Sequence, residues 1–196
     1  MPKFPADMIQ VTTARYSAHW GPLGLASISV GLAPFAFDGE MHETSLRCDQ
    51  IDLDLDDFRS VAGKSFEFPN NPEPGYIDST IYLFGIHVYV FTKRLSFGAM
   101  GEETIPLKIE ATLEFGASGL SQYADAALSL ETSLYLPLTA ARLVAIAEGA
   151  IGKAAAQSPR DLGKVMALLT KDPRTDGRMA ELNAEVRRIL QARAAS

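Results

Sequence analysis

The chain has 196 residues, of which 47% are hydrophobic and 21% charged, and its formal net charge at pH 7 is −6. This composition is typical of a globular protein and excludes a disordered or collagen-like chain. Cys48 is the single cysteine, which excludes an internal disulfide and a four-thiolate zinc site, and three histidines are too few for a histidine-rich metal site.

The N-terminal segment is not typical of a signal peptide, because Pro5, Asp7 and Gln10 interrupt its apolar residues. No stretch approaches 18 consecutive apolar residues, so we expect no transmembrane helix and no membrane partner. A free cysteine without an export signal is typical of a reducing compartment. We therefore expect a cytoplasmic protein.

The residues before Pro137 show the period of two that is typical of strands. In residues 51–56, 107–115 and 126–136, apolar side chains alternate with polar or charged ones, which predicts strands with one buried face. Residues 86–91 are apolar almost throughout, which predicts a strand covered on both faces. Turn residues separate these runs, so we expect roughly six to eight strands in an antiparallel sandwich or barrel.

The composition changes near Pro137. All ten phenylalanines, all six tyrosines and the single tryptophan lie before this residue, and the segment after it is rich in good helix formers. Residues 1–137 carry a net charge of −10, with 8 Lys and Arg against 18 Asp and Glu, whereas residues 138–196 carry +4, with 10 against 6. We therefore predict two domains, an acidic β-domain over residues 1–137 and a basic helical domain over residues 138–196.

The helical segment shows apolar residues at a period of 3.6, which predicts three short helices. Thr139 is placed to cap the first helix, and Ser158 with Pro159 forms a strong start for the second. Thr175 or Asp176 is the predicted start of the third. The predicted fold class is α+β in two segregated parts, an antiparallel β-sandwich or barrel followed by a small three-helix tail.

Two blocks of residues in the tail form a motif. The blocks are Asp161-Leu162-Gly163-Lys164-Val165-Met166 and Arg174-Thr175-Asp176-Gly177-Arg178. With them, about the last 55 residues resemble the C-terminal helical domain of the GatB/YqeY family. GatB is a subunit of the tRNA-dependent amidotransferases, and YqeY proteins are its small stand-alone relatives. The resemblance implies that the tail helps to hold tRNA, while the amidotransferase reaction belongs to other domains, which residues 1–137 do not match.

Cationic side chains of the tail are the candidate contacts for RNA or for a protein partner. Arg160 and Lys164 lie one helical turn apart, opposite the apolar residues of the second predicted helix. On the last predicted helix, Arg178, Arg187 and Arg188 are scattered around the polar arc. We predict Arg160, Lys164 and Arg178 as the RNA- or partner-binding residues; the alternative is that they form an ordinary solvated surface.

No set of residues in the sequence supports catalysis or a cofactor. Asp52–Asp57 is acidic enough for calcium, but it lacks the glycine and the glutamate that an EF-hand needs at its sixth and twelfth positions. His42 and His87 have no second ligand cluster at metal spacing, and Cys48 lies in a strand-like run where a buried thiol is expected. No nucleophile elbow, phosphate-binding loop or dinucleotide-binding turn is present. We expect no metal and no cofactor, and the pattern leans against an enzyme without deciding the question.

Two functions remain open at this point. In the first, the chain is a non-catalytic cytoplasmic accessory protein whose helical tail contacts tRNA or an RNA-bound enzyme. In the alternative, it is a protein-interaction or structural module in which the acidic domain binds a protein or small ligand and the tail is a docking bundle. Trp20, Tyr76, Tyr82 and Tyr89 are the candidate aromatic anchors of that domain. The sequence indicates no oligomeric state.

Overall fold

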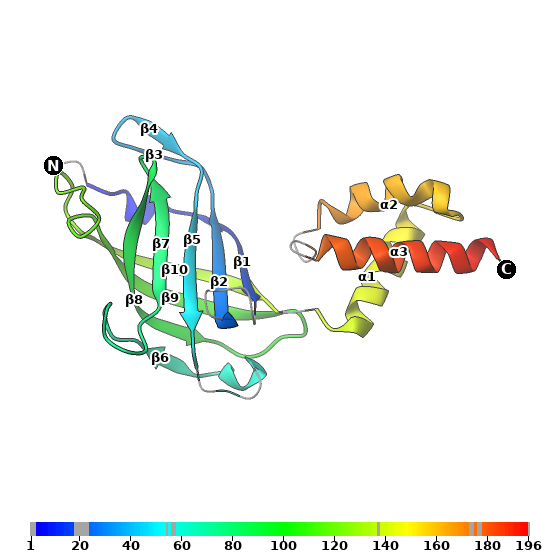
Figure 1. Ribbon diagram of the computed structural model, residues 1–196, viewed down its shortest axis with the longest axis horizontal. Helices are drawn as coiled ribbons and strands as arrows, with labels where there is room; N and C mark the ends of the chain where they lie inside the picture. The colour runs from blue at the N-terminus through cyan, green and yellow to red at the C-terminus, as the bar shows by residue number, and fades with distance from the viewer. Residues whose placement is uncertain are drawn as a thin grey trace. The chain divides into compact units, whose positions relative to one another are not determined.

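A computed structural model describes residues 3–17, 24–53, 55, 58–136, 138–172, 175 and 178–195. The chain divides into two compact units, Met1–Pro137 and Leu138–Ser196. In the described residues, the first unit contains the strands and the second contains the α-helices (Figure 1). The fold is therefore α+β with segregated parts, as predicted.

The first unit is built from ten strands in its described residues. They are β1 (Val11–Ser17), β2 (Ala26–Leu32), β3 (Phe35–Phe37), β4 (Glu40–His42), β5 (Ser45–Ile51), β6 (Ser65–Glu67), β7 (Asp78–Leu83), β8 (Ile86–Phe97), β9 (Thr104–Glu114) and β10 (Ala126–Tyr135). Two 3₁₀ turns, η1 (Ala6–Met8) and η3 (Phe58–Val61), accompany them. The β3–β4 pair forms a separate two-stranded sheet, and the other eight strands form one sheet.

Seven strands of the large sheet close into a barrel in the order β8-β7-β5-β2-β1-β10-β9, because β9 pairs back onto β8. The eighth strand, β6, pairs with the end of β8 that β7 does not reach. The described neighbours in the ring run antiparallel except β1 and β10, which are parallel and place Ala14 opposite Leu134. The sequence left a sandwich and a barrel open, and the structure is a barrel.

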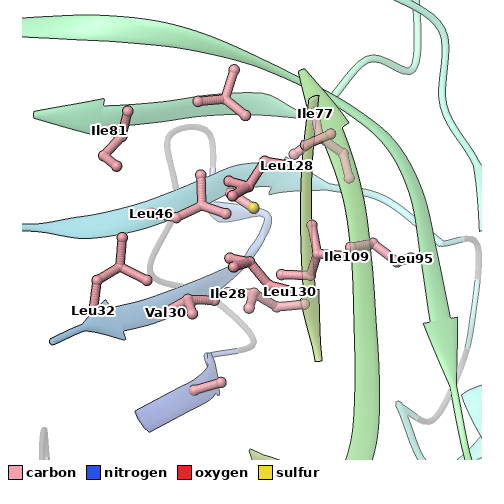
Figure 2. Packing of buried hydrophobic residues seen from close by; sticks show 14 of the residues in the cluster. Ile28, Val30, Leu32, Leu46, Ile77, Ile81, Leu95, Ile109, Leu128 and Leu130 are labelled. Carbon is pink, nitrogen blue, oxygen red and sulfur yellow. The ribbon is translucent and has the colours of Figure 1, made fainter. Parts of the chain in front are cut away.

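The barrel interior is filled by the apolar face that the period of two predicted. In β9, every second residue from Ile105 to Leu113 is buried, whereas the residues between them are partly or fully exposed. Figure 2 shows Ile28, Leu46 and Ile109 among the side chains from several strands that gather in this core. A barrel of this strand number is narrow enough for side chains to fill it.

Aromatic side chains gather at both ends of the barrel. At the end with the β7–β8 and β9–β10 turns, six rings form a cluster with centroids 5.0–5.9 Å apart: Phe4, Phe35, Phe37, Phe84, Phe115 and Tyr123. At the other end, Phe58 of η3 stacks on Tyr16 at 3.7 Å and meets Phe97 edge-on at 5.7 Å. Such ring pairs add to the stabilisation that burial of their area provides.

Three buried polar side chains meet inside the barrel wall. The hydroxyls of Ser79 on β7 and Thr92 on β8 lie 2.8 Å apart, and Cys48 Sγ on β5 lies 3.8 Å from Thr92 Oγ1. Cys48 is fully buried, which confirms the prediction of a buried thiol. Burial raises the pKa of the Cys48 thiol, so the reactive thiolate is disfavoured.

The acidic run after β5 does not form the predicted strand. β5 ends at Ile51, and Asp52, Leu53 and Leu55 lie outside any strand. Residues 54, 56 and 57 lie outside the described residues. Leu53 and Leu55 are partly buried against the barrel core. The spacing of these two residues therefore serves packing on the core, and none of the described residues of this run pairs with a neighbouring strand.

The second unit holds three α-helices in its described residues: α1 (Ala140–Lys153), α2 (Leu162–Leu169) and α3 (Met179–Ala194). A 3₁₀ turn, η4 (Pro159–Asp161), precedes α2. Their apolar faces form a separate core that includes Leu143, Val165 and Val186. Thr139 caps α1 as predicted, because its Oγ1 accepts the backbone N–H of Arg142 at 3.2 Å. None of the described helices is both long and apolar enough to cross a membrane.

The predicted start of the third helix is wrong. α3 begins at Met179, whereas the buried Thr175 donates its hydroxyl to the carbonyls of Leu169 and Asp172 at 2.6 and 2.8 Å. Thr175 therefore serves the C-terminal end of α2 and does not cap α3. Its hydroxyl donates to the carbonyl of Leu169, which has no partner within the helix because it lies in the last turn. Asp176 lies outside the described residues.

Candidate binding site

The β7–β8 hairpin turns through Phe84 and Gly85, which have φ values of +50° and +77°. Two positive φ values at the central residues are those of a type I′ turn, whose twist matches that of the strands it joins. The turn places Leu83 opposite Ile86 and fixes the register of the hairpin, with Tyr82 opposite His87 and Thr80 opposite Tyr89. Alternate residues of both strands therefore point away from the barrel core.

The outward side chains of this hairpin are aromatic and exposed. Tyr82 is 51% exposed and Tyr89 47%, and the ring of Tyr82 lies 5.2 Å from that of His87. We call Tyr82, His87 and Tyr89 the hairpin face. The prediction that residues 86–91 are covered on both faces is wrong, because burial alternates along this part of β8 and no described element covers the outer side.

A small pocket opens in the barrel wall beside the hairpin face. β7 and β8 stay in register only as far as the Thr80–Tyr89 pair, and beyond it Asp78 pairs with Asp49 of β5. A cavity of about 180 Å³ lies at this end of β7. Its lining residues are Asn70, Asn71, Ile77, Asp78, Ser79, Tyr89, Val90, Phe91, Glu114 and Ala117. Exposed Tyr89 belongs both to the hairpin face and to this pocket, so the two form one continuous site.

The polar groups of the pocket are acids and amides. Asn70 donates its side-chain N–H to Glu114 Oε1 at 3.4 Å. In the described part of the chain, the Asp78 carboxylate has no hydrogen-bond or ion-pair partner, and Glu114 has no cationic one. The described lining contains no lysine, arginine, histidine or cysteine. The pocket therefore presents two carboxylates without a counter-charge, together with the outward rings of Tyr89 and Phe91.

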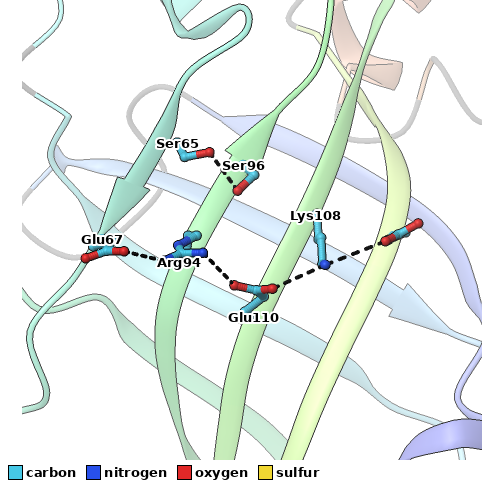
Figure 3. A network of polar contacts seen from close by, with 7 residues as sticks. Ser65, Glu67, Arg94, Ser96, Lys108 and Glu110 are labelled. Atoms are coloured by element: carbon cyan, nitrogen blue, oxygen red, sulfur yellow. Dashed lines mark hydrogen bonds and ion pairs between the residues drawn. The ribbon is translucent and has the colours of Figure 1, made fainter.

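The neighbouring outer wall has the opposite character, because its charges are paired (Figure 3). Arg94 on β8 pairs with Glu67 on β6 and with Glu110 on β9, the latter at 3.4 Å. Lys108 then contacts Glu110 at 3.2 Å and Glu131 on β10 at 3.9 Å. We call these five residues the charge ladder. The hydrogen bond to the Glu67 carboxylate raises the pKa of Arg94, which favours the charged guanidinium.

Two of the predicted aromatic anchors, Tyr82 and Tyr89, are thus brought together on the hairpin face. Tyr76 is half-buried in the loop before β7, and Trp20 lies outside the described residues. The composition of residues 86–91 concealed the site, because aromatic residues are as common in a covered strand as on an outward binding face. The pocket was hidden for another reason, since its carboxylates come from strands 36 positions apart in the chain.

The predicted site residues of the tail lie on three different elements. Arg160 is exposed in η4 and makes no side-chain hydrogen bond or ion pair with another described residue. Lys164 on α2 is 72% exposed and pairs with Asp161 at 2.9 Å. Hydrogen bonds from Lys164 and from the backbone N–H groups of Gln157 and Ser158 lower the pKa of Asp161.

Arg178 lies at the N-terminal boundary of α3 and is not joined to the other two. Its guanidinium pairs with Glu181, and Nη1 donates to the Leu138 carbonyl at 3.4 Å. No hydrogen bond or ion pair of the described residues connects Arg178 with Arg160 or Lys164. Arg160 and Lys164 thus lie four residues apart around the start of α2, and Arg178 is a structural link within the tail.

A shallow groove of about 150 Å³ lies between α1 and α2. Arg142 and Lys153 line it from α1, where they share one side of the helix with Gly149, and Leu168 lines it from α2 with 40% of its surface exposed. Sequence reasoning missed this groove, because it depends on how two helices pack. The charged residues that line the groove are Arg142, Lys153 and the acidic Asp172.

The candidate metal ligands are dispersed in the described structure. His42 is buried among Phe35, Phe37 and Phe84, with Nε2 3.4 Å from the Phe37 carbonyl, whereas His87 is exposed on the hairpin face. Among the described residues, no group of three or more His, Cys, Asp or Glu is arranged to hold a metal ion. Part of Asp52–Asp57 lies outside those residues.

Comparison of this chain with protein-family models, with curated proteins and with solved structures found no match. The likeness of the tail to the GatB/YqeY domain therefore stays a prediction from two sequence blocks. The geometry of the two surfaces is the remaining guide to function.

Proposed function

We propose that this chain is a non-catalytic cytoplasmic binding protein whose barrel holds a partner protein on the hairpin face. The observation that carries the proposal is the exposure of Tyr82 and Tyr89 on the outer side of two paired strands, continuous with a pocket. Tyrosine is enriched among the residues that dominate protein–protein binding energies, because it buries a large apolar ring and keeps a hydroxyl to hydrogen-bond.

The chemistry of the pocket supports binding over catalysis. Its described lining offers two carboxylates and two amides but no basic nucleophile, thiol or imidazole. Its serine hydroxyl, that of Ser79, is bonded to Thr92 inside the wall instead of to a base. Nucleophilic catalysis needs an activated nucleophile and a base within hydrogen-bond reach of each other. A cytoplasmic role accords with a single cysteine that is free and buried.

Affinity capture with full-length protein tests this function. Tyr82→Thr/Tyr89→Thr removes both rings and keeps β-branched residues that suit strands. Partner capture from the native cell should fall at least about tenfold, because losing a central tyrosine anchor commonly costs 2 kcal/mol or more. The matched control is Met41→Thr, which removes a side chain 67% exposed on β4 and should leave capture unchanged. Equal capture by both variants would contradict the proposal.

A second candidate function is contact of the tail with tRNA or an RNA-bound enzyme. It is favoured by the net charge of +4 in residues 138–196 and by Arg160, which has no partner in the described structure and lies one helical turn from Lys164. These groups would contact phosphate, since the tail contains no aromatic residue to stack on bases. The pairing of Lys164 and Arg178 with acids on the same unit weakens this candidate.

Retention of tRNA at low salt tests the second function. Arg160→Ala/Lys164→Ala should weaken binding and make its salt dependence shallower by roughly one counterion for each lost contact. Arg187→Ala/Arg188→Ala removes the same charge from α3 and serves as the matched control. If both double variants lose binding equally, net charge and not a site accounts for it. If the unmodified protein retains no tRNA at low salt, this second function is excluded.

A further inference from the structure

The pocket beside the hairpin face is too small for most small-molecule ligands. Its volume of about 180 Å³ lies below the roughly 300–1,000 Å³ of typical ligand pockets. The pocket has room for a single side chain from a docked protein segment. This inference rests on the proposed function, because the segment would reach the pocket from the hairpin face through the shared residue Tyr89.

The charge of the pocket indicates which side chain it takes. Three nearby cations are paired with other acids: Arg94 and Lys108 pair with the acids of the charge ladder, and Arg47 pairs with Asp49 at 3.2 Å. A fourth, Lys93, lies over the ring of Phe91. Asp78 and Glu114 are left without a cation in the described structure, and the first 137 residues carry a net charge of −10. A cationic group placed between these two carboxylates would form charge-assisted hydrogen bonds, which are the strongest that side chains make.

The rings of the pocket suit a cation as well. The ammonium of Lys93 already lies 5.7 Å from the centroid of the Phe91 ring, within the range of a cation–π contact. The ring of Tyr89, 47% exposed, has no such cation among the described residues. A guanidinium or ammonium that enters the pocket would therefore meet two carboxylates and an aromatic ring.

We propose that the pocket recognises one lysine or arginine side chain of the partner protein, carried on a segment whose neighbouring apolar residues lie on the hairpin face. Asp78 and Glu114 bind the cationic end, with Asn70 holding Glu114 in place through its 3.4 Å hydrogen bond. Tyr89 packs against the stem of the same side chain, since lysine and arginine bury their methylene groups along apolar surface.

The test uses two peptides that differ in one charge. Ac-Leu-Gly-Arg-Gly-Leu-NH₂ and the same peptide with neutral citrulline in place of arginine are titrated into full-length protein, and backbone amide shifts are followed by NMR. The arginine peptide should shift the amides of residues 70–71, 78–79, 89–91 and 114. The citrulline peptide should bind roughly tenfold more weakly, because it keeps the shape of arginine and loses the charge.

Two double variants show which carboxylates cause the preference for the arginine peptide. Asp78→Asn/Glu114→Gln should abolish the difference between the peptides, whereas Asp7→Asn/Glu102→Gln, which removes two exposed charges elsewhere on the same unit, should preserve it. Each substitution is nearly isosteric, and the unshifted remainder of the spectrum reports that the fold is intact. Sodium chloride should weaken the binding of the arginine peptide and leave the binding of the citrulline peptide unchanged.

The inference is overturned if arginine and citrulline peptides bind alike, or if neither shifts these amides at ~5 mM, a concentration at which even a Kd of 1 mM gives near-saturation. Tyr82→Thr/Tyr89→Thr separates the two proposals. If this variant loses the partner protein while the peptides show no charge preference, the hairpin face stands as a docking surface and only the cation pocket falls. If partner capture is unaffected, the proposed function itself falls.

Discussion

The outer surface of β8 differs between its two halves, although one unbroken strand carries both. From Ile86 to Phe91 its outward side chains are aromatic, and in the described structure they form no ion pair. From Lys93 to Ser96 they are polar, with Arg94 central to the charge ladder and Ser96 bonded to Ser65 at 2.8 Å (Figure 3). The inner face shows no such change, because buried residues alternate along both halves.

The two halves show that charged side chains on the outer wall pair with one another only in the half where strands bring opposite charges together. In the ladder half, Arg94 and Lys108 each contact acids on neighbouring strands. The hairpin half carries exposed rings, and beside it lie two carboxylates that have no cationic partner in the described fold. A surface that folding does not require is the better candidate for binding, and substitutions in the two halves of β8 can separate binding from folding.

Substitutions on the inner face should lower stability by similar amounts in both halves of β8, because both halves pack on the same core. Leu83→Ala beneath the hairpin face and Leu95→Ala beneath the charge ladder each empty a fully buried site. Each should lower the free energy of unfolding by about 2–5 kcal/mol. Urea denaturation followed by near-ultraviolet circular dichroism measures this, and its signal comes from residues 1–137, which hold every aromatic residue. A loss at only one of the two sites would show that the halves are not one core.

The turn that presents the hairpin face should be the next most sensitive position. Gly85→Ala places a Cβ at φ +77°, which costs about 1 kcal/mol even though its nearest neighbour, the Tyr82 hydroxyl, is at an ordinary contact distance of 4.0 Å. Gly63, with φ +71° in the turn before β6, is the counterpart at the other half, and Gly63→Ala should lose a similar amount. The same urea assay measures both. No loss for Gly85→Ala would mean that the hairpin does not hold the I′ turn.

The charge ladder should contribute less to the free energy of unfolding than the turn, and its contribution should fall as the salt concentration rises. Arg94→Ala breaks its contacts with Glu67 and Glu110, both of which are exposed. Exposed ion pairs stabilise little and are screened as ionic strength rises. We expect a smaller loss of stability than for Gly85→Ala, and no difference from the unmodified protein in 1 M sodium chloride. A loss that persists unchanged at high salt would mean that packing of the arginine stem, and not its charge, stabilises the ladder.

The hairpin face should contribute least to stability. Tyr82→Thr/Tyr89→Thr removes exposed rings and should change the free energy of unfolding by less than about 0.5 kcal/mol per site. Together with the tenfold loss of partner capture expected for the same variant, this outcome would separate binding from folding. A stability loss as large as that of Leu95→Ala would instead make the rings part of the fold.

Local pattern predicted the elements, and long-range pairing decided the architecture. The alternation in residues 107–115 and 126–136 predicted β9 and β10, because a half-buried strand must alternate. It left a sandwich and a barrel open, since closure depends on β9 meeting β8 and on β1 meeting β10. The failure at residues 86–91 has a related cause, because side-chain type does not reveal which face of a strand another element covers.

The tail shows the same limit on the scale of single residues. Its apolar period predicted the helices, but the hydroxyl of Thr175 had two possible uses, and tertiary contacts selected the carbonyls of Leu169 and Asp172. The pairing of Lys164 with Asp161 was readable in the sequence, since residues three apart share a helical face. The same holds for Arg178 and Glu181. The cation pocket had no local signal, because its acids come from separate strands.

The parallel contact between β1 and β10 has a consequence for how the protein is made. Ala14 must meet Leu134, so the first strand waits for a partner that is synthesised about 120 residues later. At the rates at which ribosomes elongate chains, this interval is on the order of ten seconds. Until it ends, one edge of the nascent sheet has no partner and is open to pairing with other chains. During this interval a ribosome-associated chaperone would do most to protect the chain from aggregation.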